Sequence, residues 1–145
     1  MEVHFLRLHD GGAFGDVWEA EDALGRRVAV KLIRSAGLAL SSALDHARAL
    51  ARAQHPNVVA VYALDTVAHP DTGLPVECVV MEWLDGETLS ARITSPRFSH
   101  DELLAIGKGL IAGLRHIHQQ GLAHGDLHAD NVMIVNGVVR IIDIL

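Results

Sequence analysis

The chain has few of the features that mark secreted, membrane-spanning or nucleic-acid-binding proteins. A single cysteine in 145 residues excludes an internal disulfide, as expected in a reducing compartment. No apolar run approaches the roughly 18 residues needed to span a bilayer, and the N-terminus lacks a basic stretch followed by an apolar one. Because 18 acidic side chains face 12 basic ones, the net charge of -6 argues against nonspecific binding to nucleic acid or anionic membranes. These absences predict a cytoplasmic protein with no membrane segment.

The residues that are present have the composition of a globular domain. Half of them are apolar and 21% are charged, which suits one hydrophobic core or two small lobes and makes disorder a poor expectation. The lone cysteine, Cys78, belongs to the apolar run Cys78-Val79-Val80-Met81. We therefore expect it to be a small buried core residue and not a reactive thiol.

The first half of the chain predicts a strand-rich unit with one helix. Strand-like patterns occur at residues 3–8, 17–20, 28–33, 58–64 and 77–83. A glycine-rich segment and a turn at 24–26 separate the first three, which predicts an antiparallel meander. The alanine- and leucine-rich stretch up to Gln54 predicts a helix that Ser41 and Ser42 can cap and that Pro56 ends.

The second half predicts helices followed by a β-hairpin. A short helix is expected at 89–93. A longer one begins after Ser99, with Glu102 in the capping-box position, and runs to about Gln120 before Gly121. Residues 132–142 predict two strands, because the dipeptide Asn136-Gly137 suits a type I′ turn.

The long helix predicted from Ser99 to Gln120 has an unusually wide apolar arc. One stripe comprises Leu103, Ile106, Leu110, Leu114 and Ile117. Leu104 and Ile111 lie about a quarter turn away and widen the apolar surface. We expect this helix to need partners on more than one side, either a further C-terminal segment of the protein or a partner chain.

Two features near the N-terminus point to phosphate binding. The segment Asp10–Val17 is rich in glycine and lies between two predicted strands, where backbone N–H groups can approach phosphate oxygens without a side chain in the way. A plain tight hairpin explains such a segment about as well. The second feature is Lys31, in the strand Val28-Ala29-Val30-Lys31. A lysine among core residues is costly unless an anion meets it, although a lysine at a strand edge can also extend to solvent.

The strongest signal is His124-Gly125-Asp126-Leu127-His128-Ala129-Asp130-Asn131, followed by the hairpin and then Asp143. Phosphoryl transfer needs a carboxylate that orients the attacking hydroxyl and oxygen ligands for Mg²⁺. Asp126, Asn131 and Asp143 supply these groups, and the two-stranded ribbon returns Asp143 to the vicinity of the other two. Three independent placements would have to be accidental if these were ordinary surface residues.

In this order the motifs resemble the eukaryotic-like protein kinase family, of serine/threonine type. His55-Pro56-Asn57-Val58-Val59 and the segment Val80–Leu89 add to the resemblance, which covers essentially the whole chain. It implies an α+β fold: a five-stranded antiparallel N-lobe with one helix at 1–84, and a partial, mainly helical C-lobe with a β-hairpin at 85–145. The implied activity is transfer of the ATP γ-phosphate to a hydroxyl.

The same resemblance implies a role for each motif residue. Gly12 and Gly15 would cover the ATP phosphates, and Lys31 would contact the α- and β-phosphates. Asp126 would be the catalytic carboxylate, with Asn131 and Asp143 as Mg²⁺ ligands. The adenine pocket would be formed by Val17 and Ala29 above the ring, Met133 below it, Met81 as gatekeeper, and Glu82 and Trp83 as the hinge.

Several positions depart from the family pattern. Asp10 replaces the first loop glycine, and His46 stands where a glutamate usually pairs with the strand lysine. Gly125 replaces an arginine that usually binds a phosphorylated activation loop, so regulation by that route is not expected. Leu145 falls at the glycine of Asp-Phe-Gly. With His46, it favours an alternative in which the chain is a pseudokinase module that works by holding a partner.

Two further alternatives concern the substrate and the metal. The string His124–His128 with a following asparagine is also similar to aminoglycoside phosphotransferases and related small-molecule kinases, so the acceptor is either a protein hydroxyl or a small molecule. Ten histidines, four of them at 116, 118, 124 and 128, raise the alternative of a metal-binding protein. Their spacing does not match that of zinc sites. The sequence thus predicts a kinase whose 145 residues are inactive alone.

Overall fold

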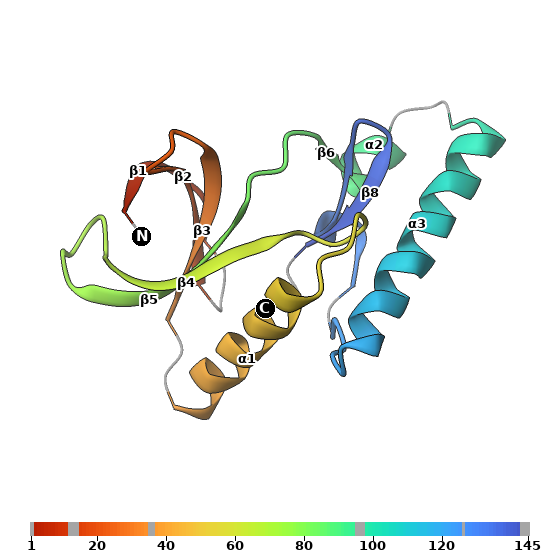
Figure 1. Cartoon of the computed structure of the whole chain (residues 1–145). Coiled ribbons are helices and arrows are strands. Elements are labelled where there is room, and N and C mark those ends of the chain that lie inside the picture. Colours follow the sequence, from red (N-terminus) through yellow and green to blue (C-terminus); the bar gives the residue numbers. More distant parts are fainter. Residues whose placement is uncertain (1, 12–14, 35–36, 95–97, 126, 143–145) are drawn as a thin grey trace. The chain divides into compact units, whose positions relative to one another are not determined.

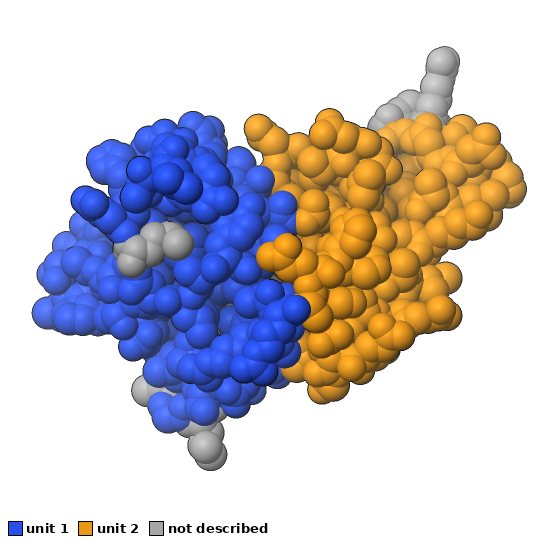
Figure 2. Space-filling view, viewed as in Figure 1, with its two compact units in different colours: residues 1–52, 60–83 blue, residues 53–59, 84–145 orange. Residues whose placement is uncertain are grey.

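The computed structural model describes residues 2–11, 15–34, 37–94, 98–125 and 127–142. The chain forms two compact units, coloured separately in Figure 2. Unit 1 comprises Met1–Arg52 and Ala60–Trp83, and unit 2 comprises Ala53–Val59 and Leu84–Leu145. In the part of the chain that the model describes, no helix is long and apolar enough to cross a membrane.

Unit 1 is built on a five-stranded sheet whose strands lie in the order β1-β2-β3-β5-β4 (Figure 1). All four pairings are antiparallel. The strands are β1 (Val3–Gly11), β2 (Gly15–Asp22), β3 (Arg27–Ile33), β4 (Val61–Ala68) and β5 (Pro75–Glu82). The predicted α+β class with a five-stranded antiparallel sheet is therefore confirmed. The two central strands do not alternate between buried and exposed residues: residues 28–33 of β3 and 78–80 of β5 are continuously buried, so both faces of the sheet are covered at these strands.

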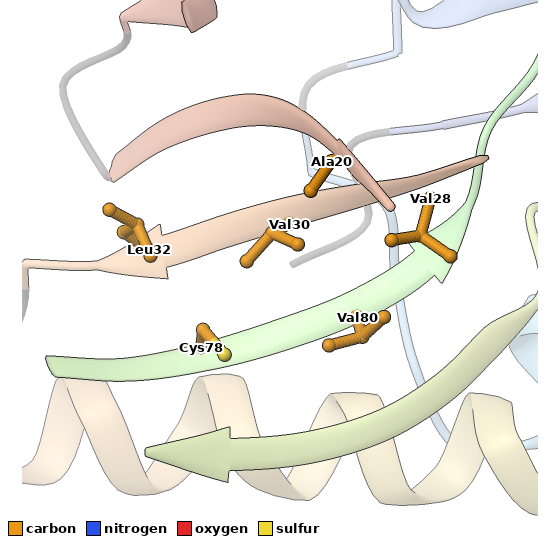
Figure 3. Packing of buried hydrophobic residues seen from close by; sticks show 6 residues of the cluster. All are labelled: Ala20, Val28, Val30, Leu32, Cys78 and Val80. Carbon is orange, nitrogen blue, oxygen red and sulfur yellow. The ribbon is translucent and has the colours of Figure 1, made fainter. Parts of the chain in front are cut away.

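One face of this sheet carries the core of unit 1 (Figure 3). Its fully buried members are Ala20, Val28, Val30, Leu32, Cys78 and Val80. The Phe5 and Trp18 rings pack beside it, edge to face with centroids 5.6 Å apart. Burial raises the pKa of the Cys78 thiol to about 11. This cysteine is therefore an uncharged core side chain at neutral pH, as the sequence predicted.

Helix α1 (Leu38–Arg52) packs against β4 and differs from its prediction at the N-terminus. It begins three residues before Ser41, so Ser41 and Ser42 lie inside the helix and the expected cap is wrong. The high helix propensity of the flanking leucines and alanine extends the helix past the serines. The strand expected at 58–64 also starts later, at Val61. Val58 instead forms an isolated bridge with Ile141 in unit 2.

Unit 2 contains a three-stranded sheet of β6 (Glu87–Thr88), β7 (Val132–Val135) and β8 (Val138–Ile141). The predicted hairpin of β7 and β8 is confirmed, and Asn136 and Gly137 have φ values of 51° and 79°. Both values are those of the type I′ turn that an Asn-Gly pair favours. The two-residue strand β6 was not predicted, because a strand this short leaves no periodic pattern.

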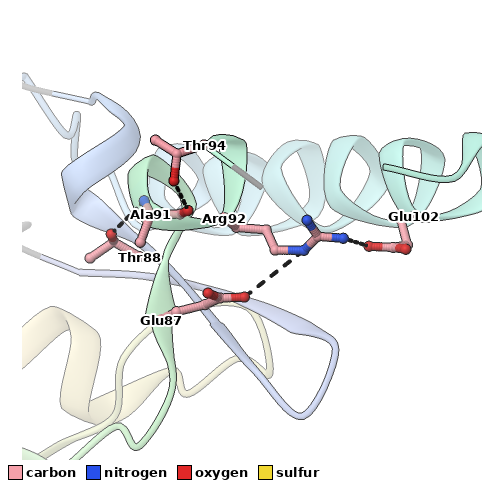
Figure 4. Close-up of polar contacts among 6 residues, drawn as sticks. All are labelled: Glu87, Thr88, Ala91, Arg92, Thr94 and Glu102. Atoms are coloured by element: carbon pink, nitrogen blue, oxygen red, sulfur yellow. Dashed lines mark hydrogen bonds and ion pairs between the residues drawn. The ribbon is translucent and has the colours of Figure 1, made fainter. Parts of the chain in front are cut away.

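Two helices of unit 2 are joined by polar contacts (Figure 4). They are α2 (Leu89–Ile93) and α3 (His100–Gln119), and Ser99 caps α3 as predicted by accepting the Glu102 N–H. The Arg92 guanidinium donates to Glu102 at 2.5 Å, lies 3.9 Å from Glu87 and covers the Phe98 ring. The hydrogen bond from Arg92 is the main reason that the pKa of Glu102 lies below its usual value.

One side of α3 lies against β8 and the segment 53–59, which we call the anchor segment. Asn57 Nδ2 donates to Val139 O, and the Ile141 and Val59 N–H groups bind Asn57 O and Ile141 O, respectively. Gly113 permits the close approach, because a Cβ atom there would lie 2.9 Å from Asn57 O. The other side of α3 is apolar and exposed at Leu103, Leu104 and Ile111.

A pair of stacked histidines also links the anchor segment to α3. The rings of His55 and His116 lie 4.8 Å apart at 30°, and His116 Nε2 contacts Ala53 O. His55 Nδ1 accepts the Asn57 N–H at 3.0 Å, which requires that nitrogen to be unprotonated. Burial, followed by the charge of His116, lowers the pKa of His55 below 6.5.

We expect the free energy of unfolding to fall as the solution becomes acidic. Because the folded pKa of His55 is lowered, the unfolded chain binds more protons below pH 6.5. The stability contribution is therefore complete above pH 6.5 and decreases as the pH falls through the folded pKa. Urea unfolding between pH 8 and pH 5 measures this slope. The His55→Asn variant keeps an acceptor for Asn57 N–H but does not titrate, so an unchanged slope in that variant would contradict the assignment.

Candidate functional site

Four of the predicted nucleotide residues of unit 1 share one face of the sheet. Strand registers place Val17 opposite Lys31, and Ala29 opposite Met81. Because side chains two residues apart in a strand point the same way, Ala29 and Lys31 are on the same face. This face is the opposite of the one that carries the core in Figure 3. The sheet therefore brings Val17, Ala29, Lys31 and Met81 together.

Lys31 is the buried cation of this face, with only 7% of its surface exposed. A buried ammonium beside apolar residues of the same face is a group that can bind an anionic ligand. His46, which stands where the family usually has a glutamate, is half-buried on α1. The neighbouring carboxylate, Asp45, forms an exposed ion pair with Arg48 at 2.9 Å.

Glu82 and Trp83, the predicted hinge, are held by contacts within unit 1. Glu82 N–H donates to Ala60 O at 3.0 Å, and the Glu82 carboxylate accepts the Ala60 N–H at 2.8 Å. The Trp83 indole meets the His9 ring edge to face, with centroids 5.1 Å apart. These contacts fix the end of β5, directly after the predicted gatekeeper Met81.

A buried carboxylate on the same sheet face was not anticipated from the sequence. Glu19 is 3% exposed and pairs with Arg7 on β1 and with Arg27 on β3, the latter at 2.8 Å. It therefore joins three neighbouring strands on the face that carries Ala29, its partner in the register. One signal in the sequence could have indicated this ion pair. Glu19 and Glu21 are acidic residues at alternate positions of one strand, and Arg27 lies at the start of the next strand.

In unit 2, the predicted metal ligand Asn131 ends the short 3₁₀ turn η1 (Ala129–Asn131) and is 5% exposed. The backbone carbonyl oxygen of Asn131 accepts the Ile142 N–H at 3.0 Å. The backbone oxygen of Ile142 contacts His124 Nε2 at 2.6 Å. Ile142 is thus tied through both backbone groups to the loop that carries Asn131. A buried carboxamide oxygen at this position fits a hard divalent cation.

Several predicted residues are less fully described. Asp126, Asp143 and Gly12 lie outside the described residues, as does Leu145. Gly15 is the first residue of β2. Met133 is half-buried in β7, opposite Thr88 of β6 and Arg140 of β8.

The histidine-rich character of the chain has structural explanations in the described part. His116 stacks on His55, His124 contacts Ile142 O, and His128 contacts η1. Among the residues that the model describes, no group of three or more histidine, cysteine or acidic residues could hold a metal ion. These contacts disfavour the alternative of a histidine-ligated zinc protein.

The fold and these motifs agree with comparisons to known proteins. The family model described as protein kinase domain matches residues 10–144. A probable serine/threonine-protein kinase of Arabidopsis thaliana is 33% identical over 91% of this chain and 23% of its own length. Serine/threonine-protein kinase PrkC of Bacillus subtilis is 30% identical over 95% of this chain and 22% of its own length. The chain belongs to the protein kinase family.

The relatives are much longer than the aligned region. The mouse serine/threonine-protein kinase Nek5 is 29% identical over 94% of this chain, but the alignment covers 21% of Nek5. The chain therefore spans less than a quarter of the length of these three relatives.

Proposed function

We propose that this chain is the nucleotide-binding and catalytic-loop part of a serine/threonine protein kinase. The reaction is transfer of the ATP γ-phosphate, with Mg²⁺, to a serine or threonine hydroxyl of a protein. The observation that carries the proposal is the family match over residues 10–144, which includes every motif residue assigned a role. Serine/threonine kinases among the relatives favour a protein acceptor over a small molecule.

The face of unit 1 described above supports the nucleotide half of the proposal. Val17, Ala29 and Met81 provide an apolar surface for adenine, and Lys31 provides a cation for the α- and β-phosphates. Gly12 and Gly15 allow the backbone N–H groups of their loop to approach phosphate oxygens. Glu82 and Trp83 offer backbone groups to the adenine edge. Met133 is the residue of unit 2 that the family resemblance assigns to the adenine pocket.

The loop of unit 2 supports the transfer half. Asp126 would accept the proton of the attacking hydroxyl and orient it toward the γ-phosphate. Asn131 and Asp143 would hold Mg²⁺, which neutralises the charge that develops on the phosphate oxygens. The two backbone bonds of Ile142 support this assignment, because Asp143 is the next residue in the chain.

The proposed cellular setting follows from charge and composition. A single cysteine, which cannot form an internal disulfide, suits a cytoplasmic protein, and the net charge of -6 suits one with no nucleic-acid partner. We further propose the division at residue 84 as the boundary between the kinase lobes. In the structure, the anchor segment belongs to the second compact unit.

Two measurements on the full-length protein test the proposal. Mg·ATP should raise the melting temperature, because a ligand that binds only the folded state stabilises it. The wild-type protein should transfer ³²P from [γ-³²P]ATP to protein substrates. The Asp126→Asn variant should transfer it about 10²–10⁴-fold more slowly. Absence of a thermal shift would contradict nucleotide binding. Equal labelling by wild type and Asp126→Asn would contradict the role of Asp126, and a thermal shift without transfer would indicate a pseudokinase.

A further inference from the structure

The Glu19 carboxylate ties three strands of unit 1 together from one buried position. Its Oε2 pairs with Arg7 Nε of β1, and its Oε1 lies 2.8 Å from Arg27 Nη1 of β3. Glu19 itself is buried, whereas both arginine side chains are more than half exposed. Because each carboxylate oxygen binds a different arginine, no other kind of side chain of this size can make both contacts. We call these three side chains the Glu19 clamp.

Strand β1 is the strand that most needs such a tie. Its register with β2 shifts once on each side of the pair Arg7 and Leu8, and Leu6 and His9 have no partner in the register. A bulge leaves its extra residue unpaired and disrupts the backbone ladder locally. The ion pair of Arg7 with Glu19 therefore fixes β1 to β2 at a point where the ladder is interrupted on both sides.

The strands that the clamp joins carry the nucleotide residues of the proposed function. Glu19 lies two residues after Val17 on β2, so their side chains are on the same face, and it is opposite Ala29 of β3. Strand β2 begins at Gly15, which is opposite Ile33 at the end of β3. The attachment of β2 to its two neighbours therefore sets where Gly15 and Val17 lie relative to β3.

We propose that Glu19 is a positioning residue for the nucleotide, because its two arginine pairs hold β1 and β2 against β3 in the arrangement that binds ATP. The inference rests on the proposed function, in which Gly15, Val17 and Ala29 contact ATP. When a binding arrangement is only partly populated, the apparent affinity is reduced by the populated fraction. The clamp keeps that fraction high, so it acts on ATP affinity and not on the transfer step.

The test uses substitutions that remove the clamp from the full-length protein. In Glu19→Gln the side chain keeps its size, but its single carbonyl oxygen can accept from only one of the two arginines. We expect this variant to bind a Mg·non-hydrolysable ATP analogue about tenfold more weakly by isothermal titration, with kcat within about twofold of wild type. Arg7→Gln cuts the tie to β1 at an exposed position and should weaken binding to a similar extent. The double variant should add little, because both substitutions open the same clamp.

Asp22→Asn is the matched control. Asp22 is another buried carboxylate of β2, and it lies 2.7 Å from Arg26. It also accepts the Leu24 and Arg26 N–H groups in the turn after β2, and asparagine keeps an oxygen for these two bonds. Both Asp22→Asn and Glu19→Gln remove one paired negative charge from the same strand, and both should lower the free energy of unfolding. Only Glu19→Gln should weaken nucleotide binding.

The outcomes separate this inference from the proposed function. If the wild type binds the Mg·analogue complex and Glu19→Gln binds it equally well, the role of Glu19 is overturned and the proposed function stands. An equal loss of affinity in Asp22→Asn also overturns this role, because general destabilisation then explains the effect. If Glu19→Gln does not fold, Arg7→Gln decides, and unchanged affinity in that variant overturns the inference. Failure of the wild type to bind overturns the proposed function, and this inference with it.

Discussion

Replacing Lys31 with methionine is expected to lower kcat/KM for ATP in the full-length protein by about 10²–10³-fold, the usual cost of removing one charge-stabilising donor from a phosphoryl- or acyl-transfer site. Methionine is unbranched and of similar length, so it fills the buried space of a side chain that is only 7% exposed. The lost group is then chiefly the ammonium. Steady-state kinetics with varied ATP measures the effect, and circular dichroism checks that the fold is kept.

The chain supplies a matched control for this substitution. It contains two lysines, and the second, Lys108, is exposed on α3 in unit 2. Lys108→Met changes the net charge by the same amount at a position outside the proposed site. We expect kcat/KM to remain within about twofold of wild type. If Lys108→Met and Lys31→Met reduce activity equally, the effect comes from net charge, and the assigned role of Lys31 is wrong.

A second large effect is expected on stability, at Gly113 of α3. In Gly113→Ala, the added Cβ would lie 2.7 Å from Ile141 Cδ1 and 2.9 Å from Asn57 O. The isoleucine methyl can move, but the Asn57 carbonyl belongs to the backbone that pairs with Ile141. Overpacking of this kind costs about 1–3 kcal/mol, which exceeds the gain in helix propensity. Urea unfolding of the variant measures the loss.

Gly107 on the same helix is the control. A Cβ atom there meets nothing within 4 Å, so Gly107→Ala should stabilise the protein by about 0.5–1 kcal/mol through helix propensity alone. The two substitutions are chemically identical and are predicted to have opposite signs. If both variants are stabilised, α3 does not approach the anchor segment as closely as described.

Local signals in the sequence were sufficient for most of the elements. The Asn136-Gly137 turn, the Ser99 cap and the five strands of unit 1 depend on residues close in the chain, and the structure confirms them. The start of α1 and of β4 could not be placed. The start of α1 is hard to place because helix propensity changes little between neighbouring residues of this segment. The start of β4 is hard to place because Val58 forms a bridge with Ile141, a residue far away in the sequence.

For the candidate site, the sequence by itself supplied the prediction of its chemistry. The order of Lys31, Asn131 and the other motif residues resembles that of protein kinases, and this resemblance predicts phosphoryl transfer with a nucleotide and a metal. The tertiary structure alone decided which of them are buried, and it added contacts that no motif contains. Glu19 joins three strands and His128 holds the Asn131 amide. The contacts of Glu19 depend on strand register, which is fixed only when residues distant in the chain pair, whereas the contact of His128 with Asn131 depends on the conformation of a single 3₁₀ turn.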